Sequence, residues 1–409
     1  MKDFLLKPFK LLNKIQHYAW GTKNENAFIP NLLGIEVIKD LPYAELWIGA
    51  HPSASSEILI NGGRFPLNTI IEKYPEAFLG KYVISKFGSQ LPFLLKVLSA
   101  AKALSIQTHP DKEQAKKLHM SDPENYPDDN HKPEIAIAVD SLIAVAGFRP
   151  EKEIVENLNN NPEIFKLINK ELSSLNINVF GEEELKIQLK DIYQRIMKKS
   201  SDKEMLEKVT GRIIEKLSGK EKLSKEEFQF LKQHKLFGAD VGLLSFFFFN
   251  MVELKPGQAI FTDAGIPHAY IEGTIVECMA NSDNVIRAGL TKKFKDVETL
   301  LDIIRYDFSE YKIINEEQAN DNVIYKTNAS EFEVTAFSKK HGFNQIFNSG
   351  SKPAVILIMK GSVEINWENS TGQKTEIFQK GESILIPAAL SEFSLACKGN
   401  AVFFIVGVP

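Results

Sequence analysis

The sequence predicts a mainly β protein that consists of two stacked jelly-roll barrels, with a block of α-helices inserted into the first. Three observations carry this prediction. Short apolar runs separated by Pro and Gly turns fill residues 1–150 and return after residue 237. Between them, residues 151–236 have Leu and Ile at helical spacing among many Lys and Glu residues. The β regions also contain an internal repeat, as expected for two related barrels.

Residues 1–150 supply the first strands. Segments such as AELWIGAHPSASSEI, LPFLLKVLSA and EIAIAVDSLIAVAGF combine apolar residues with turn-forming Pro, Gly and Ser. Residues 151–236 follow as the helical insertion, because segments such as EEELKIQLKDIYQRIMKK are amphipathic and no proline follows Pro162 within the block. Strands then resume. The first barrel is therefore discontinuous and comprises residues 1–150 and 237–324, with one helix predicted near residues 295–305.

The most apolar run of the chain is VGLLSFFFFNMVEL, residues 241–254. It lies between Asp240 and Lys255 and is interrupted by Asn250 and Glu253. It is shorter than the roughly 20 residues that a membrane-spanning helix needs. We therefore expect a buried strand or a pair of strands here.

An internal repeat relates the two β regions. The segment ELKPGQAIFTDAGIPHAYIEG (253–273) aligns with IFQKGESILIPAALSEFSLAC (377–397) at a constant offset of 124 residues, so that Gly257 matches Gly381. Both copies consist of a turn glycine, a short strand, a tight turn and a second strand. Repeated β units of this kind predict two related barrels, the second formed by residues 325–409.

The two copies differ at one chemically important position. The first copy has the pattern G-x5-D-x-G-x2-H, which ends at His268 and is close to the second motif of the cupins. The second copy has Glu392 at the histidine position and Ala389 at the turn glycine. We therefore predict two cupin-type jelly-roll barrels with an inserted α-helical domain. The first barrel keeps a polar ligand at this turn, and the C-terminal barrel lacks metal ligands.

Four residues form a candidate metal site: Gln107, His109, Glu134 and His268. Gln107 and His109 stand two positions apart, so a strand would place both on one face. Glu134 opens the apolar strand PEIAIAV, and His268 ends the cupin-like turn. Two imidazole nitrogens, a carboxylate oxygen and an amide oxygen suit Zn²⁺, and we expect one zinc ion per chain. Fe²⁺ is the second choice, because His109, Glu134 and His268 also match a facial triad of two histidines and one carboxylate.

Each of these residues also has an ordinary explanation. Most of the eight histidines are expected at the surface or as satisfied core residues. Glu134 inside an apolar strand needs a counter-charge, which either a metal or an ion pair with Lys132 would provide. The combination of the four residues, rather than any single one, carries the prediction of a metal site.

A polar segment, ECMANSDNVIRAGLTKKF (277–294), follows the cupin-like turn and gathers Glu277, Asp283 and Arg287. It is either an ordinary polar surface loop or a loop that lines a site at the mouth of the barrel. Arg287 is flanked by apolar residues. That context indicates a semi-buried guanidinium that faces an anionic group.

Further charged and aromatic residues are candidates for substrate binding. Lys96 and Ser105 lie on the approach to the strand with Gln107, and an anionic ligand would satisfy Lys96 together with Lys132 and Arg287. The alternative is a set of surface charges. Trp20 and the aromatic residues of AELWIGAHPSASS suit a sugar-binding wall, and they equally suit packing within a barrel.

Composition excludes several classes of protein. The chain has 409 residues, enough for two or three domains, and its content of 44% hydrophobic and 25% charged residues is typical of soluble globular proteins. The formal net charge of −4 argues against a nucleic-acid-binding protein. Cys278 and Cys397 are far apart, and no signal peptide is recognisable. We therefore expect a cytoplasmic protein without membrane association.

Taken together, the motifs resemble those of the type I mannose-6-phosphate isomerases (phosphomannose isomerases) of the cupin superfamily. The matching segments are YAWG, AELWIGAHPSASS, PFLLKVLSAAKALSIQTHPDK, HKPEIAIAV, AGFRP, DAGIPHAY and SDNVIRAGLTKKFKDV. They occur in the order of the family, from residue 18 to about residue 297. One departure is LTKKF in place of the more usual LTPKF. The C-terminal barrel matches the family in kind rather than by motif.

The resemblance implies a zinc-dependent isomerase that interconverts mannose 6-phosphate and fructose 6-phosphate through an enediol. It implies metal ligation by the four residues named above, a catalytic role for Arg287, and substrate contacts by Lys96, Ser105, Lys132 and Asp283. The expected partner is a sugar phosphate, and we expect the chain to act as a monomer.

The sequence leaves the proton carrier open. Arg287 cannot be a general base because its pKa exceeds about 12, so it would stabilise the enediolate. The candidates are a metal-bound water, Glu277, His51 and Lys132. Two other functions also stay open: an Fe²⁺-dependent cupin oxygenase and a non-enzymatic sugar-binding cupin. Gln107 as a fourth ligand argues against the oxygenase, and the polar segment beside the metal set argues against the binding protein.

Overall fold

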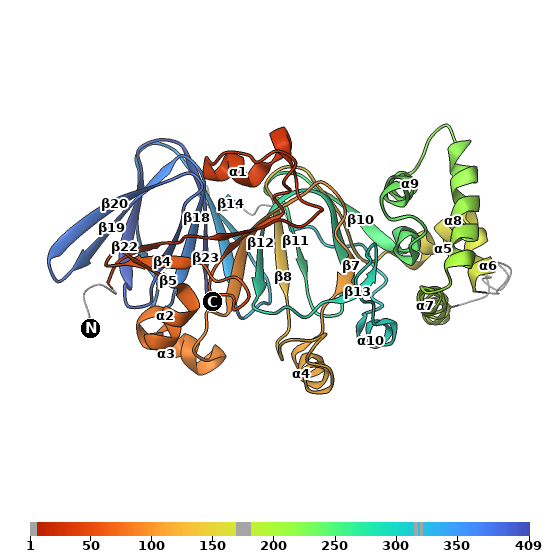
Figure 1. The fold of residues 1–409 in the computed structure, drawn as a ribbon, viewed down its shortest axis with the longest axis horizontal. Helices are drawn as coiled ribbons and strands as arrows, with labels where there is room; N and C mark the ends of the chain where they lie inside the picture. Colours follow the sequence, from red (N-terminus) through yellow and green to blue (C-terminus); the bar gives the residue numbers. More distant parts are fainter. Residues whose placement is uncertain (1–5, 169–180, 315–317, 320–321) are drawn as a thin grey trace.

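The computed structural model describes residues 6–168, 181–314, 318–319 and 322–409. Three parts follow one another along the long axis of the molecule (Figure 1). The C-terminal strands lie at one end, the strands around β12 lie in the middle, and a group of helices lies at the other end. The mainly β character predicted from the sequence is confirmed.

The middle part is a ten-stranded arrangement with β12 (His268–Ala280) at its centre. The first half of β12 pairs with β7 (Ile106–Thr108) and β9 (Leu142–Phe148). The second half pairs with β6 (Phe93–Ala100) and β8 (Glu134–Ala138). The other strands are β2 (Lys14–Gln16), β3 (Glu45–Ile48), β10 (Phe249–Leu254), β11 (Ala259–Thr262) and β13 (Ile286–Gly289).

Strand β12 changes partners at an irregularity in its middle. Its register with β9 shifts between Tyr270 and Glu272. The next residue, Gly273, has a φ of 128°, and a Cβ atom there would lie 2.4 Å from the carbonyl oxygen of Ser141. A β-bulge of this kind bends a strand and increases its twist. β12 can therefore connect β7 on one side of the site with β8 on the other.

The C-terminal part consists of two facing sheets. A seven-stranded sheet has the order β1-β21-β18-β23-β16-β15-β14, and a four-stranded sheet has the order β17-β22-β19-β20. Buried side chains from both sheets, such as Ile356, Ile365 and Leu395, form a common apolar core. The strands are β1 (Phe9–Lys10), β14 (Gln318–Ala319), β15 (Asn322–Tyr325), β16 (Glu333–Lys339), β17 (Phe343–Asn348), β18 (Ala354–Lys360), β19 (Ser362–Asn369), β20 (Gly372–Gln379), β21 (Ser383–Ile386), β22 (Glu392–Cys397) and β23 (Ala401–Gly407).

Facing antiparallel sheets are the basis of a jelly roll. Within the part of the chain that the structure describes, however, the strand pairings form open sheets and no closed barrel. The description as two barrels therefore stays a prediction. The division into residues 1–150 with 237–324, residues 151–236 and residues 325–409 also stays a prediction.

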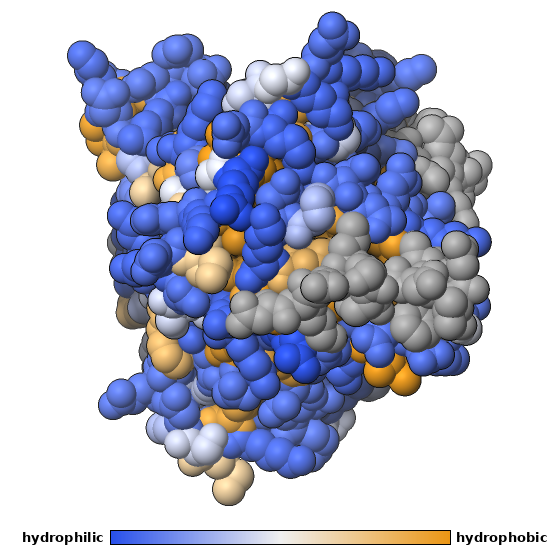
Figure 2. All heavy atoms as spheres, turned by 90° about the vertical axis from the view of Figure 1, so that its right-hand side faces the viewer, coloured by the Kyte–Doolittle hydropathy of each residue, from blue (hydrophilic) through white to orange (hydrophobic). Residues whose placement is uncertain are grey.

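The helical character predicted for the block after residue 150 is confirmed. On α7, buried Leu185, Leu189, Ile192 and Ile196 recur every three or four residues, so one face packs inward. Viewed from this end, the surface of the molecule is mainly hydrophilic (Figure 2). The helices are α5 (Glu151–Asn160), α6 (Glu163–Leu167), α7 (Glu182–Lys198), α8 (Lys203–Ser218) and α9 (Lys225–Phe237).

The remaining helices lie beside the strands. The helix predicted near residues 295–305 is present as α10 (Val297–Ile303). None of the helices described combines the length and the apolar content that crossing a membrane requires. The others are α1 (Phe28–Leu33), α2 (Leu67–Lys73), α3 (Pro75–Phe87), α4 (Lys112–Ser121) and the 3₁₀ helix η2 (Asn24–Asn26), and a small hairpin is formed by β4 (Glu57–Ile60) and β5 (Gly63–Pro66).

The prediction for residues 241–254 was half wrong. The first half forms a buried 3₁₀ helix, η4 (Val241–Phe247), and only the second half is a strand, β10. A fully apolar run has no periodicity that separates a strand from a buried helix. The available signal was Asp240, whose carboxylate accepts a hydrogen bond from the backbone N–H of Gly242 at 2.7 Å and caps the helix.

The internal repeat is visible in the structure. Strands β11 and β21 have the same length and the same place in the two copies, and β12 and β22 begin at the matched positions His268 and Glu392. The turn glycines Gly257 and Gly381 have φ values of 86° and 85°. The two copies therefore share their backbone course, although only the first carries a histidine at the start of its second strand.

Gly265 in the first copy allows a test of this turn. Its φ is 77°, and a Cβ atom would lie 2.8 Å from the carbonyl oxygen of Ile303 and 2.7 Å from Cγ of Arg305. We expect Gly265→Ala to lower the free energy of unfolding by about 1–3 kcal/mol, measured by chemical denaturation. Gly62→Ala is the matched control, because Gly62 also has a positive φ, 84°, but no atom within 4 Å of the added Cβ. Equal losses in both variants would contradict the role of the close contacts.

Candidate metal and substrate site

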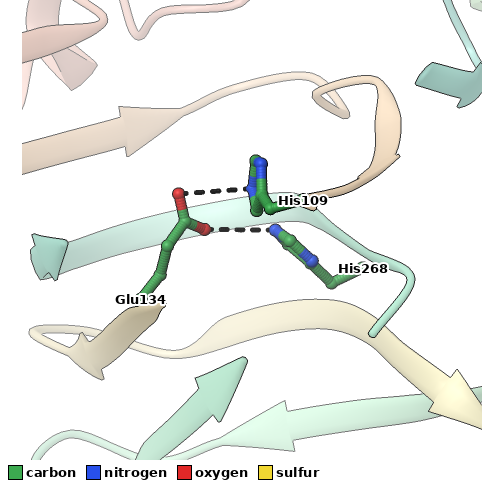
Figure 3. A group of neighbouring side chains, drawn as sticks. All are labelled: His109, Glu134 and His268. Carbon is green, nitrogen blue, oxygen red and sulfur yellow. Dashed lines mark hydrogen bonds and ion pairs between the residues drawn. The ribbon is translucent and has the colours of Figure 1, made fainter. Parts of the chain in front are cut away.

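Three strands bring the candidate metal ligands together (Figure 3). His109 directly follows β7, Glu134 opens β8, and His268 opens β12. Their side chains are fully buried, and their candidate ligand atoms all lie within 4.8 Å of one another. Among the described residues, no other group of three or more His, Cys, Asp or Glu side chains meets this criterion.

Hydrogen bonds to backbone carbonyls orient both imidazole rings. Nδ1 of His109 lies 2.7 Å from the carbonyl oxygen of Asn284, and Nδ1 of His268 lies 3.0 Å from that of Ile266. Because a carbonyl oxygen only accepts, Nδ1 must carry the proton in both rings, and Nε2 of a neutral ring then has a free lone pair. The two Nε2 atoms point at the carboxylate of Glu134, at 3.5 Å and 3.1 Å.

This arrangement fits a metal ion. Nε2 of His109 is buried and has no hydrogen-bond partner. Burial lowers the pKa of the His109 imidazole to about 4, so the ring is neutral near pH 7. The lone pair on Nε2 of the neutral His109 ring faces the carboxylate of Glu134, and a cation between them would relieve this repulsion. Neutral imidazoles with a carboxylate are the ligand set of zinc sites.

The ion pair with Lys132, which was the alternative to a metal as the counter-charge of Glu134, is also present. Nζ of Lys132 lies 3.1 Å from one oxygen of Glu134. Burial alone would raise the pKa of Glu134, but Lys132 and His109 outweigh it and hold the pKa well below its usual range. The ion pair with Lys132 therefore explains the charge of Glu134. It leaves Nε2 of His109 without a hydrogen-bond partner, whereas Nε2 of His268 lies 3.1 Å from the other oxygen of Glu134.

Gln107 lies beside these residues in the sheet. It is directly opposite His268 on β12 and opposite Arg287 on β13. Opposed residues of antiparallel strands have Cβ atoms about 4.5–5.5 Å apart and present their side chains on the same face. Because β7 lies between β12 and β13, Gln107 has His268 as its neighbour on one side and Arg287 as its neighbour on the other.

A cavity of about 660 Å³ opens beside the metal ligands. It has the size of a small-molecule site and a mixture of aromatic and charged walls. His109 and His268 are fully buried and do not line it. Except for His51, the other predicted site residues line it, namely Trp20, Lys96, Ser105, Gln107, Lys132, Glu134, Glu277, Asp283 and Arg287.

One wall of the cavity contains a row of buried charges. Nζ of Lys96 lies 3.5 Å from Glu45 and 3.2 Å from Glu277, and 5.0 Å from the centre of the Trp47 ring. Burial alone would lower the pKa of Lys96, but Glu45 and Glu277 outweigh it and raise the pKa. Burial raises the pKa of Glu277; Lys96 opposes this effect, and the charges of Glu134 and Glu45 add to it. Glu277 is thus a carboxyl group whose proton affinity is increased at the edge of the cavity.

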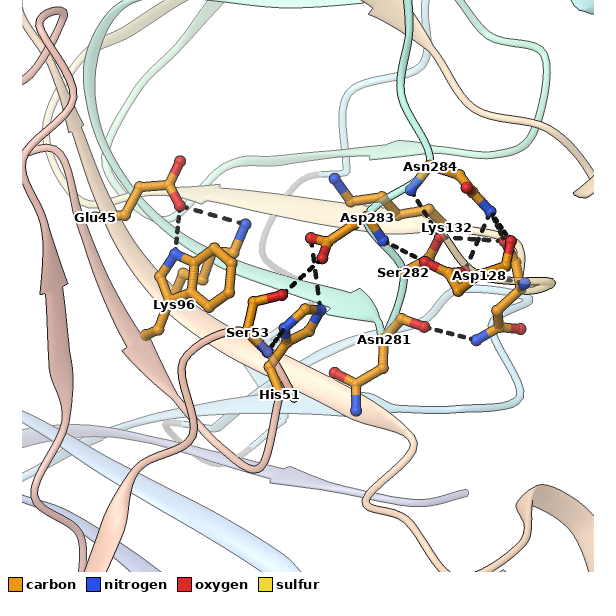
Figure 4. A network of polar contacts seen from close by, with 12 residues as sticks. Glu45, His51, Ser53, Lys96, Asp128, Lys132, Asn281, Ser282, Asp283 and Asn284 are labelled. Atoms are coloured by element: carbon orange, nitrogen blue, oxygen red, sulfur yellow. Dashed lines mark hydrogen bonds and ion pairs between the residues drawn. The ribbon is translucent and has the colours of Figure 1, made fainter. Parts of the chain in front are cut away.

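A hydrogen-bonded network fixes the segment after β12 (Figure 4). The amide of Asn284 donates to the backbone oxygens of Asp128 and Asn130, and the backbone N–H of Asp283 donates to the carboxylate of Asp128 at 2.7 Å. The carbonyl of the same Asn284 orients His109. The network therefore holds a ligand of the candidate metal site through its backbone.

Asp283 and His51 are connected to the same network. Oγ of Ser53 donates to the carboxylate of Asp283 at 3.0 Å, and Nε2 of His51 lies 3.6 Å from it. Burial lowers the pKa of His51, which favours its neutral form. His51 is buried and does not line the cavity, so its position is less favourable for proton transfer than that of Glu277.

Arg287 lies on β13 with its side chain half-buried at the cavity. Burial lowers the pKa of its guanidinium. Among the described residues it forms no salt bridge and no side-chain hydrogen bond. A partly buried cation without an anionic partner is less stable than a paired one, so this position suits an anionic ligand.

The expectation of one polar loop over residues 277–294 was wrong. Glu277 belongs to β12 and is buried, and Arg287 belongs to β13, so only the short connection between these strands is a loop. Sequence reasoning also missed Tyr270, which lines the cavity and whose Oη is buried without a partner. Its signal was the pattern HAY, since residues two apart on a strand share a face with His268. Burial raises the pKa of Tyr270 well above its usual range.

Comparisons with known proteins give a consistent result. Residues 8–151 match the family model of the catalytic domain of type I phosphomannose isomerase. Mannose-6-phosphate isomerase 2 of Arabidopsis thaliana is 36% identical over 391 residues, which cover 91% of this chain and 87% of the relative. The mannose-6-phosphate isomerase of Homo sapiens is 39% identical over 317 residues, 74% of each chain.

Solved structures extend the similarity to the fold. A variant of phosphomannose isomerase from Salmonella typhimurium has a TM-score of 0.86 and 29% identity, and the match covers 98% of this chain and 99% of the other. A mannose 6-phosphate isomerase bound with zinc and yttrium has a TM-score of 0.84 and 28% identity over the same shares.

Proposed function

The chain belongs to the type I phosphomannose isomerases and is a mannose-6-phosphate isomerase. From this premise we propose that it uses zinc to interconvert mannose 6-phosphate and fructose 6-phosphate in the cavity described above. The observation that carries the proposal is the convergence of the Nε2 atoms of His109 and His268 on the carboxylate of Glu134 at the cavity. The substrate would approach the metal from the cavity, because Glu134 is the one of these three residues that lines the cavity wall.

We propose that His109, Glu134 and His268 hold one zinc ion, with Gln107 as the fourth ligand. The buried and unpartnered Nε2 of His109 supports this assignment, and so does the position of Gln107 opposite His268. The relative bound with zinc supports the choice of metal. When bound, zinc would polarise the substrate carbonyl and stabilise negative charge on the adjacent oxygens.

Glu277 is the proposed proton carrier between C2 and C1 of the open-chain sugar, with an enediol as the intermediate. A general base works best when its pKa lies near the working pH, and burial raises the pKa of Glu277 in that direction. Lys96 holds the carboxylate at 3.2 Å and so fixes its orientation. Lys132 lies against Glu134 rather than free in the cavity, which makes it the weaker candidate.

Arg287 is the proposed partner of the negative charge that develops on the sugar oxygens. Its unpaired guanidinium lies in the cavity wall beside Gln107, and preorganised cations act most strongly in sites that exclude water. Lys96 and Ser105 are proposed contacts of the substrate, with Trp20 as a stacking surface and Asp283 as an acceptor for sugar hydroxyl groups. Their shared position on the cavity wall supports these roles.

We also propose that the chain acts as a cytoplasmic monomer. Cys278 and Cys397 are both buried and unpaired, which suits a reducing compartment.

Metal analysis combined with a coupled assay for fructose 6-phosphate tests this proposal. We expect about one zinc ion per folded chain, and isomerisation that is lost on chelation and restored by Zn²⁺. The melting temperature should fall on chelation, because a ligand that binds only the folded state stabilises it. Bound iron in place of zinc, with no isomerisation by a folded chain, would contradict the zinc assignment and favour the oxygenase.

A further inference from the structure

The backbone just after Arg287 adopts an unusual conformation. Leu290 has a φ of 53°, in the left-handed region that non-glycine residues rarely adopt. Its side chain is buried and lines the cavity. The pairing of β13 with β7 is also irregular, with a register shift between Arg287 and Gly289. A strained residue persists only where its surroundings hold it, and such residues cluster at functional sites.

Asp240 provides the contact that holds this conformation. One carboxylate oxygen, Oδ1, accepts the backbone N–H of Leu290 at 2.8 Å and that of Gly242 at 2.7 Å. The other oxygen lies 3.3 Å from Nζ of Lys295. The side chain of Asp240 is only 10% exposed, so water competes little for these hydrogen bonds. A single carboxylate therefore connects the start of η4 with the end of β13.

Close backbone packing reinforces the same connection. Gly242 in η4 lies against Gly289 in β13, so that a Cβ atom added at Gly242 would be 2.8 Å from Cα of Gly289. A Cβ atom added at Gly289 would be 2.4 Å from Cα of Gly242. Neither position has room for a side chain. The segment that leaves helix α9 is thus fitted directly onto the strand that carries Arg287.

We propose that Asp240 is a positioning residue for the isomerase reaction. It holds Leu290 in its left-handed conformation and so fixes the end of β13. The end of β13 in turn determines where the side chain of Arg287 enters the cavity. The inference rests on the proposed role of Arg287. Among the described residues no ion pair anchors the guanidinium of Arg287, so the place of its backbone on β13 decides which part of the cavity the side chain can reach. Misplacement of a catalytic group by about 1 Å can reduce turnover about a hundredfold.

A double-mutant cycle on the full, metal-loaded chain tests the proposal. We expect Asp240→Ala to reduce kcat by about ten- to a hundredfold with a smaller change in KM. Asp240→Asn keeps an oxygen acceptor and should retain most of kcat. In the background of Leu290→Gly the left-handed conformation no longer costs strain, so Asp240→Ala should reduce kcat much less there than beside Leu290.

Asp202→Ala is the matched control. The carboxylate of Asp202 also accepts a backbone N–H, from Met205 at 3.3 Å, and lies 3.5 Å from a lysine, but it caps α8 far from β13 in sequence. It should lower the melting temperature and leave kcat unchanged. If Asp240→Ala costs the same factor in kcat in the parent chain and in the Leu290→Gly background, the proposal is overturned. Arg287→Ala, measured in parallel, separates the two ideas: full activity there contradicts the role of Arg287, whereas lost activity there with intact Asp240→Ala contradicts only the positioning role of Asp240.

Discussion

We expect His268→Ala to lose the proposed metal and to reduce kcat by about a thousandfold or more, while the chain stays folded. Loss of one imidazole leaves two strong ligands, His109 and Glu134, which are too few to hold zinc tightly. The metal stabilises transition-state charge by several kcal/mol, which corresponds to about three powers of ten in rate. Elemental analysis, circular dichroism and the coupled assay on the same preparation measure all three properties.

His119→Ala is the control for this variant. Nδ1 of His119 also lies close to a backbone carbonyl, that of Tyr126 at 2.7 Å, but within the described part of the chain its other nitrogen forms no ion pair with a carboxylate. The variant should keep both zinc and activity. A His268→Ala protein with full zinc content would refute the ligand assignment, and one with full activity would refute the need for the metal.

Glu277→Gln is expected to have the second largest effect. Removal of a positioned base typically reduces the rate about 10²–10⁴-fold, and the metal should stay bound because Glu277 is not one of its proposed ligands. The pH dependence has a definite sign. A base must be deprotonated, so in the parent enzyme kcat/KM falls as the pH falls through the raised pKa of Glu277. Glu277→Gln should abolish this acidic limb.

The matched control is Glu272→Gln, on the same strand. Glu272 is 46% exposed and forms a salt bridge with Lys232 at the surface. It should retain the parental rate and pH profile. If Glu277→Gln instead keeps the acidic limb at a reduced rate, then another group carries the proton, and Glu277 only supports Lys96.

The candidate metal site was largely predictable from the sequence, because its chemistry depends on short local patterns. The spacing of Gln107 and His109 places them together whenever the segment is a strand. The turn before His268 is specified by a glycine pattern, and its second copy in the C-terminal part shows the same backbone with Glu392 in place of the histidine. The buried position of Glu134 followed from its apolar neighbours.

Other features depend on contacts between distant segments and could not be predicted. The run at 241–254 carries no periodicity, so its division into η4 and β10 is decided by the cap at Asp240 and by packing. The raised pKa of Glu277 requires knowledge of its burial beside Lys96 and Glu45. The strain at Leu290 appears only in the backbone angles.

The bulge in β12 has a consequence for how the active site is encoded. Side chains alternate between the two faces of a strand, so residues nine positions apart, such as His268 and Glu277, should point in opposite directions. The extra residue between Tyr270 and Glu272 reverses the alternation, and Tyr270, Glu277 and Met279 all line the same cavity. The candidate ligand His268 and the proposed base Glu277 thus lie on the same face of β12 because of one irregular residue. Lengthening or shortening β12 by a single position would separate them without changing either.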